Sequence, residues 1–194
     1  MESQANHSEP QRWYVMRVTY QRELLARKLL EDIGIESFVA TARVRCRKVG
    51  VGVGYKEVSL LHNYIFIHST ESMLKEIKTH TIPYLRYLMA NDESGRSVKQ
   101  FVESKQMEDF MAICRSEGAR ILSEQENLLF GDRVRIVSGP LSGVEGYYVG
   151  SSSRRGGRVV VRIEGVAAVA TATYPTSAVE KILPPSPFNP SQKN

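Results

Sequence analysis

The chain has 194 residues, of which 42% are hydrophobic and 24% are charged, and its formal net charge at neutral pH is +5. This length allows one domain or two small ones, and the basic balance favours an anionic partner without requiring one. With no apolar run long enough to span a membrane, no apolar leader and only two distant cysteines, Cys46 and Cys114, the sequence indicates a soluble cytoplasmic protein with reduced thiols.

The first part of the chain alternates strand and helix patterns. Residues 1–11 are polar and predict a disordered tail, and residues 13–20 predict a strand rich in aromatic and β-branched residues. Apolar residues at helical spacing predict a helix over 22–33, in which Glu23 and Arg27 can pair on a face other than the apolar one. The further predicted elements, in order, are an extended segment (36–49), a glycine-rich connection (49–56), a strand (60–67), a helix (72–80), a strand (84–89) and a helix (104–116).

The last part of the chain carries only strand patterns. Residues 118–127 have little periodicity and predict a linker, residues 128–183 predict closely spaced strands, and residues 184–194 predict a second disordered tail. Within this part, a Gly-Asp-x-Val-Arg-Ile run is followed by Gly-Pro-x-x-Gly-x-x-Gly, a pattern that resembles a KOW motif. The residues that carry it are Gly131, Asp132, Val134, Gly139, Pro140, Gly143 and Gly146.

These patterns together predict an α+β protein of two domains. The order β-α-β-β-α-β-α over residues 12–117 predicts a sandwich with a mainly antiparallel sheet flanked by helices. Because the KOW motif follows this predicted sandwich in the sequence, the chain resembles the NusG/Spt5 family of transcription elongation factors. The resemblance rests on Trp13-Tyr14-Val15, on residues 60–67 and 81–88, and on their order. It implies an N-terminal NGN domain followed by a small all-β, SH3-like KOW barrel at 128–183.

One departure from the family pattern points to a specialised member. His62-Asn63 stands where the family usually has Pro-Gly, and an Asn before Tyr64 resembles operon-restricted members of the RfaH type. Residues 13–24 are similar to UpxY-type antiterminators, which implies action on long capsular-polysaccharide operons. Two alternatives stay open: a general NusG-type elongation and termination factor, and a KOW-containing RNA-binding ribosomal or translation protein.

The resemblance implies an apolar docking surface for RNA polymerase. Family members dock on the clamp helices of the largest polymerase subunit, and such a surface needs exposed apolar residues with aromatic anchors. Strand alternation places some of the matching residues in the core instead. The residues on the matching segments are Leu61, Tyr64, Phe66, Leu85 and Leu88.

The resemblance also implies contact with the non-template DNA strand at the junction of the first strand and first helix. There Tyr20 can stack on an unpaired base, Gln21 can hydrogen-bond one, and Arg22 can pair with a phosphate or a base edge. A run of charged residues is more often a solvated face than a binding site. The other basic residues assigned to nucleic acid are Arg17, Arg43, Arg45, Arg47 and Lys48.

No pattern indicates an enzyme, a cofactor or a metal site. The four histidines are scattered without ligand spacing, and the Gly50-x-Gly52-x-Gly54 run lacks the Lys-Ser/Thr of a phosphate loop. The resemblance instead implies an adaptor whose KOW domain recruits ribosomal protein S10, Rho or another factor, with the KOW glycines serving the fold.

Overall fold

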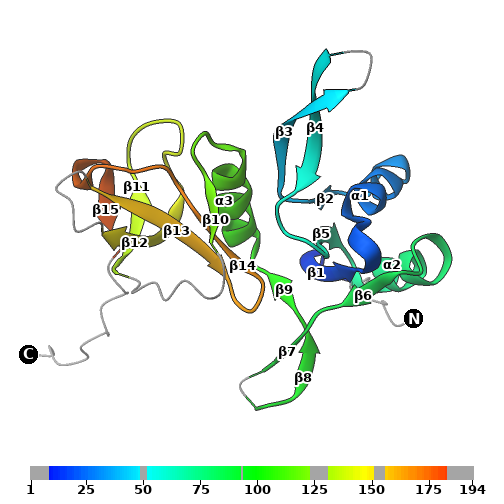
Figure 1. The fold of residues 1–194 in the computed structure, drawn as a ribbon. Helices are drawn as coiled ribbons and strands as arrows, with labels where there is room; N and C mark the ends of the chain where they lie inside the picture. The colour runs from blue at the N-terminus through cyan, green and yellow to red at the C-terminus, as the bar shows by residue number, and fades with distance from the viewer. Residues whose placement is uncertain (1–8, 49–51, 93, 123–130, 151–155, 183–194) are drawn as a thin grey trace, which may run out of the picture. The chain divides into compact units, whose positions relative to one another are not determined.

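A computed structural model describes residues 9–48, 52–92, 94–122, 131–150 and 156–182. The chain divides into two compact units, residues 1–111 and 112–194, and the division falls within helix α3, Ser104–Arg115. Figure 1 shows a mixture of helices and strands in the first part of the chain and strands in the second. The expected α+β fold class with a C-terminal all-β part is confirmed.

The first unit is built on an antiparallel sheet with β1 at its centre. The strand order is β2-β5-β1-β6, and the short strand β9 also pairs with β1. Because β1 has neighbours on both edges and side chains packed on both faces, five of its seven residues are buried. The strands are β1 (Arg12–Val18), β2 (Ser37–Phe38), β5 (Tyr64–Ser69), β6 (Leu85–Tyr87) and β9 (Phe101–Val102).

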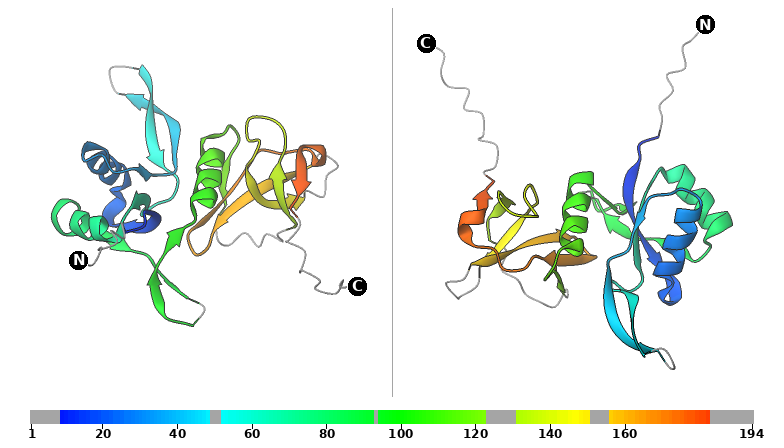
Figure 2. Two further views of the ribbon diagram at one scale, coloured as in Figure 1. Left: turned by 180° about the vertical axis from the view of Figure 1, so that it is seen from behind. Right: turned by 90° about the horizontal axis from the view of Figure 1, so that it is seen from above.

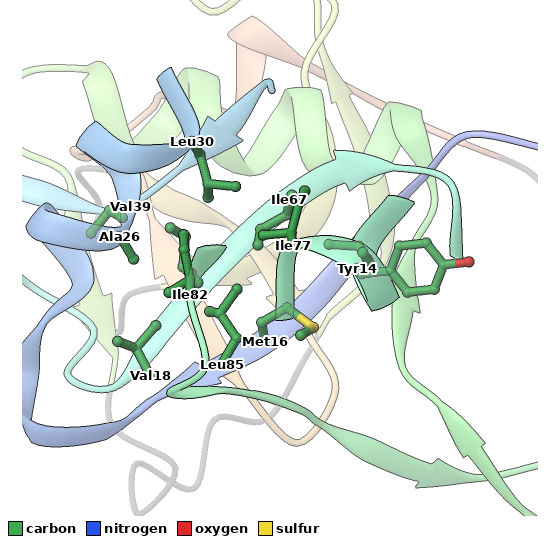
Figure 3. Packing of buried hydrophobic residues seen from close by; sticks show 12 residues of the cluster. Tyr14, Met16, Val18, Ala26, Leu30, Val39, Ile67, Ile77, Ile82 and Leu85 are labelled. Carbon is green, nitrogen blue, oxygen red and sulfur yellow. The ribbon is translucent and has the colours of Figure 1, made fainter. Parts of the chain in front are cut away.

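Two helices contribute to the core on one face of this sheet. Helix α1 (Glu23–Asp32) supplies Ala26 and Leu30, and α2 (Glu71–Glu76) supplies Leu74. A π-helical turn, η2 (Ile77–Thr81), continues α2. Figure 3 shows Ala26 and Leu30 of α1 and Ile77 of η2 packed among side chains of the sheet. The cluster comprises Tyr14, Met16, Val18, Ala26, Leu30, Val39, Ile65, Ile67, Leu74, Ile77, Ile82 and Leu85.

The side chain of Phe66 packs among aromatic rings. The ring of Phe110, on α3, lies 5.6 Å from that of Phe66 and 6.4 Å from that of Phe38, between centroids. Phe66 and Phe110 are fully buried. Alternate residues of β5 therefore belong to different packing groups, with Ile65 and Ile67 in the cluster of α1 and α2 and Phe66 among these rings.

Two hairpins extend from the first unit (Figures 1 and 2). One joins β3 (Thr41–Lys48) to β4 (Gly52–Ser59), and the other joins β7 (Met89–Asn91) to β8 (Ser97–Lys99). The glycine-rich connection predicted at 49–56 is therefore mostly strand, while residues 49–51 lie outside the described residues. Eight residue pairs join β3 and β4 in an antiparallel ladder. The backbone hydrogen bonds of this ladder hold the glycine-containing segment as a regular strand, although its glycines by themselves favour an irregular connection.

The second unit is a six-stranded antiparallel sheet of order β10-β14-β13-β12-β11-β15. Part of the predicted linker is in fact strand β10, which pairs with β14, while residues 123–127 lie outside the described residues. Strand β10 has three residues, which are too few to show an alternating pattern in the sequence. The strands are β10 (Arg120–Leu122), β11 (Arg133–Ile136), β12 (Glu145–Gly150), β13 (Gly157–Ile163), β14 (Ala167–Ala170) and β15 (Val179–Lys181), and a 3-10 turn, η3 (Thr176–Ala178), precedes β15.

The KOW-like residues form the β11–β12 hairpin. Gly143 has a φ of +91°, which side chains rarely adopt, and its amide donates to the carbonyl of Ile136. At Gly146 a Cβ atom would lie 2.6 Å from the carbonyl oxygen of Val160 on the neighbouring strand. Both glycines are therefore required by the backbone.

Candidate functional site

The junction between β1 and α1 is a strained turn. Three residues other than glycine have positive φ among the described residues: Tyr20 at +61°, Gln21 at +52° and Asn63 at +67°. Tyr20 and Gln21 lie in the 3-10 turn η1 (Thr19–Gln21), and Asn63 immediately precedes β5. A left-handed conformation costs such a residue about 1–2 kcal/mol, and strain of this kind gathers at functional sites.

Hydrogen bonds join the two strained turns. The amide of Gln21 donates to Asn63 Oδ1 at 3.4 Å, and the amide of Val18 donates to the Asn63 carbonyl at 2.9 Å. The amide of Asn63 in turn donates to Glu23 Oε1. Glu23 is 2% exposed, so this carboxylate is a buried acceptor at the start of α1. The predicted pairing of Glu23 with Arg27 does not form, because Glu23 faces the turn.

The exposed side chain of Tyr20 lies against a stack of cationic and aromatic groups. The Arg22 guanidinium is 5.4 Å from the Tyr20 ring centroid and 5.2 Å from that of Tyr84. Tyr20 is 82% exposed, so most of its ring faces solvent. An aromatic ring held by a cation and open to solvent is suited to stacking on a base. The structure thus brings together the predicted residues Tyr20, Gln21 and Arg22.

Arg17 lies in a second polar row that crosses the sheet. It is paired with Tyr64 on one side and with Arg86 on the other. Its guanidinium donates to the Tyr64 hydroxyl at 3.2 Å and lies 5.5 Å from that ring, and the hydrogen bond raises the pKa of Arg17. The row Arg17, Tyr64 and Arg86 is therefore positively charged at any physiological pH.

The predicted polymerase-docking residues divide by burial. Phe66 and Leu85 are fully buried and belong to the core, which corrects their assignment to a surface. Leu61 is 8% exposed, so it too is largely covered, while Tyr64 and Leu88 are half-buried. The physical reason is that both faces of this sheet are packed, so alternation along a strand does not select an exposed face.

The β3–β4 hairpin carries an aromatic and basic face. Arg45 is paired with Tyr55, and the Arg43 guanidinium lies 5.6 Å from the Tyr55 ring centroid. Tyr55 is 62% exposed and Val53 54%. The backbones of the other two predicted residues, Arg47 and Lys48, belong to β3, while their side chains lie outside the described part.

A carboxylate fixes the base of this hairpin to α1. Arg27 donates two hydrogen bonds to Glu57, of 3.0 and 2.6 Å, and the Thr41 hydroxyl donates a third of 2.7 Å. The bonds from Arg27 and Thr41 lower the pKa of Glu57 to about 2. Glu57 therefore stays ionised at neutral pH and its charge is balanced by that of Arg27, so Arg43 and Arg45 on the same hairpin are left as net positive charge.

Several arginines of the second unit pair with carboxylates. Arg133 and Arg135 both donate to Glu145, at 3.1 and 2.6 Å, and Arg162 donates to Glu164 at 2.7 Å. These carboxylates offset the charge of their arginine partners. The second unit should therefore attract an anionic partner less strongly than its number of arginines suggests.

Metal binding and thiol chemistry find little support in the described residues. In that part of the chain, no three His, Cys, Asp or Glu side chains are grouped so that they could hold a metal ion. Burial raises the pKa of the Cys114 thiol to about 12, which disfavours the reactive thiolate. Of the described helices, none has the length and apolarity needed to cross a membrane.

Three residues of the junction were not predicted from the sequence: Glu23, Asn63 and Tyr84. In the sequence, Asn63 stands out only as a departure from Pro-Gly, and Glu23 only as an ion-pair partner for Arg27. An Asn in place of the usual Gly could have indicated a left-handed residue, since Asn adopts that conformation more readily than most. The contact of Glu23 with Asn63 spans 40 residues, and no local pattern predicts it.

Comparisons with known proteins place the chain among transcription factors. A family model described as "Transcription termination factor nusG" matches residues 11–122. Among solved structures, a Thermotoga maritima NusG studied for its domain interaction is similar at 20% identity and a TM-score of 0.41, over 90% of this chain and 98% of that one. The MjSpt4:Spt5 complex is similar at 14% identity and a TM-score of 0.29, over 88% and 96%. No curated protein matches the chain.

Proposed function

Because the chain belongs to the NusG family of transcription factors, we propose that it is an antitermination factor acting on specific long operons, in the manner of the UpxY-type and RfaH-type members. Residues 12–117 form its polymerase-binding domain, which holds the clamp of RNA polymerase and reduces pausing. The KOW domain at 128–183 recruits a second partner, such as ribosomal protein S10 or Rho, at a raised effective concentration. Capsular-polysaccharide genes are the proposed targets.

The single observation that supports action on specific operons is the conformation of the turn between β1 and α1. A general factor needs no base-reading side chains, whereas this turn presents Tyr20, Gln21 and Arg22 in a fixed conformation beside Asn63. An exposed aromatic ring and a guanidinium suit an unpaired base and its phosphate. The proposed ligand of the turn is therefore the non-template DNA strand, with Arg17 and the β3–β4 arginines adding affinity for its backbone.

The polymerase contact is proposed for the half-buried part of the predicted surface. Tyr64 and Leu88 retain exposed area, whereas Phe66 and Leu85 support the surface from beneath. Arg17 lies next to Tyr64, and Arg86 lies on the far side of Arg17, so the polymerase surface that meets this row should carry acidic residues near its apolar centre.

One experiment separates this function from its alternatives. The purified full chain is used to capture polymerase core with intact clamp helices and core from which those helices are deleted. We expect retention of the first and loss of the second. Equal retention of both would contradict clamp binding, and co-sedimentation with ribosomes in the absence of polymerase would favour the RNA-binding alternative.

The range of target genes separates the specific form from the general one. Deleting the gene should lower the distal-to-proximal transcript ratio in one long operon. A similar fall in many operons would favour a general elongation and termination factor, the alternative to which the description of the matching family points.

A further inference from the structure

We propose that Glu23 and Asn63 are positioning residues that preset the Tyr20–Gln21 turn, so that the ring of Tyr20 is ready to stack on an unpaired base of single-stranded DNA. This inference rests on the proposed function, because it assigns the turn a nucleic-acid ligand. It adds two residues that do not themselves need to touch DNA.

Strained residues from two turns meet at the junction of β1 and α1. Asn63 is more than 40 residues away from Tyr20 and Gln21 in the sequence, yet the two turns meet through the Gln21 amide and Asn63 Oδ1. Residues in rare backbone conformations persist only where their surroundings hold them. A turn whose only role was to connect β1 to α1 could use glycine at these positions without strain.

A buried carboxylate holds the turn that contains Asn63. Glu23 is 2% exposed, and it accepts the amide of Asn63. A buried carboxylate is retained only with hydrogen-bond partners, and its position at the first turn of α1 adds favourable helix-dipole interaction. Removing the acceptor would leave the Asn63 amide without a partner, and the turn that Asn63 supports would lose its fixed geometry.

Two aromatic rings share one guanidinium beside the turn. Arg22 lies over the rings of both Tyr20 and Tyr84, and among the described residues the Tyr84 hydroxyl is buried without a hydrogen-bond partner. Tyr84 therefore serves as an apolar platform for Arg22, and Arg22 supports Tyr20. A base on the open face of Tyr20 would extend this stack. Because the turn already holds this conformation before DNA binds, binding would lose little conformational entropy.

The test compares two substitutions of similar size in the full chain. Glu23→Met removes the acceptor while it keeps the volume and helix propensity, and Glu23→Gln keeps a carbonyl oxygen that can still accept. The probe is a fluorescein-labelled, mixed-sequence single-stranded 20-mer DNA at low salt. We expect about tenfold weaker binding for Glu23→Met, from the loss of a preset geometry, and binding within about twofold of the wild type for Glu23→Gln.

A structural readout accompanies the affinity. Hydrogen exchange at the Asn63 amide should become at least about tenfold faster in Glu23→Met and stay unchanged in Glu23→Gln. Asn63→Gly is a second variant that folds without strain, since glycine adopts positive φ and keeps the amide that Glu23 accepts. It removes Oδ1, the acceptor of the Gln21 amide, and should weaken DNA binding about threefold at an unchanged melting temperature.

Tyr20→Ala distinguishes failure of this inference from failure of the proposed function. Stacking of one base on an aromatic ring predicts that Tyr20→Ala weakens binding about 5- to 150-fold. If Tyr20→Ala weakens binding while Glu23→Met and Asn63→Gly bind as the wild type does, the positioning role is wrong. If Tyr20→Ala itself binds as tightly as the wild type, the turn does not contact DNA, and both proposals fail at this site.

Discussion

Gly146→Ala should destabilise the second unit by several kcal/mol. A Cβ atom at position 146 would lie 2.6 Å from the Val160 carbonyl oxygen and 2.8 Å from Val159 Cγ1. Strand β13 would have to move away from β12, against the pairing of Tyr147 with Val160. Overpacking costs about 1–3 kcal/mol, and because backbone atoms cannot rotate aside, we expect about 3 kcal/mol. For a unit of this size, that lowers the melting temperature by about 12–24 °C.

Gly150→Ala, on the same strand, is the matched control. Nothing lies within 4 Å of a Cβ atom at position 150, so the melting temperature should stay within a few degrees of the wild type. Far-UV circular dichroism follows both units, whereas fluorescence of Trp13, the chain's single tryptophan, follows the first unit, where the residue is 4% exposed. We expect Gly146→Ala to shift the dichroism transition and to leave the Trp13 transition in place. Equal melting temperatures for the two alanine variants would refute the close-approach argument.

Two further predictions concern the first unit. Phe110→Ala removes a fully buried ring that contacts Phe38 and Phe66. It should lower the free energy of unfolding, followed by Trp13 fluorescence in denaturant, by about 3–5 kcal/mol. A loss below 1 kcal/mol would contradict this packing. The lowered pKa of Glu57, about 2, means that its ion pair with Arg27 contributes stability above pH 4.5 and loses it as the pH falls toward 2. Glu57→Gln should therefore destabilise the protein by about 0.5–1 kcal/mol at pH 7, since the pair is partly exposed, and by almost nothing at pH 2. A pH-independent difference in melting temperature would contradict the assignment.

Elements defined by local periodicity could be predicted from the sequence. Apolar spacing in α1 and α3 and the apolar runs of β1 and β5 each fix an element through residues close in the chain. The KOW hairpin could be predicted as well, because its glycines occupy positions that other residues fill only with strain or collision. Strands β9 and β10 have two and three residues, so only their distant partners, β1 and β14, define them.

The surface residues were harder to predict, because exposure depends on what covers each face. Phe66 and Leu85 lie on segments that match a docking surface, and the alternation of β5 is compatible with an exposed Phe66. Phe110 lies 44 positions later in the chain and packs against Phe66. Tyr64, two positions earlier on β5, remains half-buried and pairs with Arg17. Burial thus depends on the tertiary packing, and the residue pattern of a single strand does not predict which face other elements will cover.

The junction shows how a local prediction and a distant contact combine. The side chains of Tyr20, Gln21 and Arg22 indicate a nucleic-acid surface, but no local pattern in the sequence requires these residues to hold one conformation. Glycine at positions 20, 21 and 63 would remove the strain and, with it, the side chains of Tyr20 and Gln21 that could contact a base. The chain instead keeps the side chains, and the buried carboxylate of Glu23 accepts the amide of Asn63 beneath them. A flexible turn would need neither the strain nor the buried charge, so their joint presence argues that the conformation itself is required.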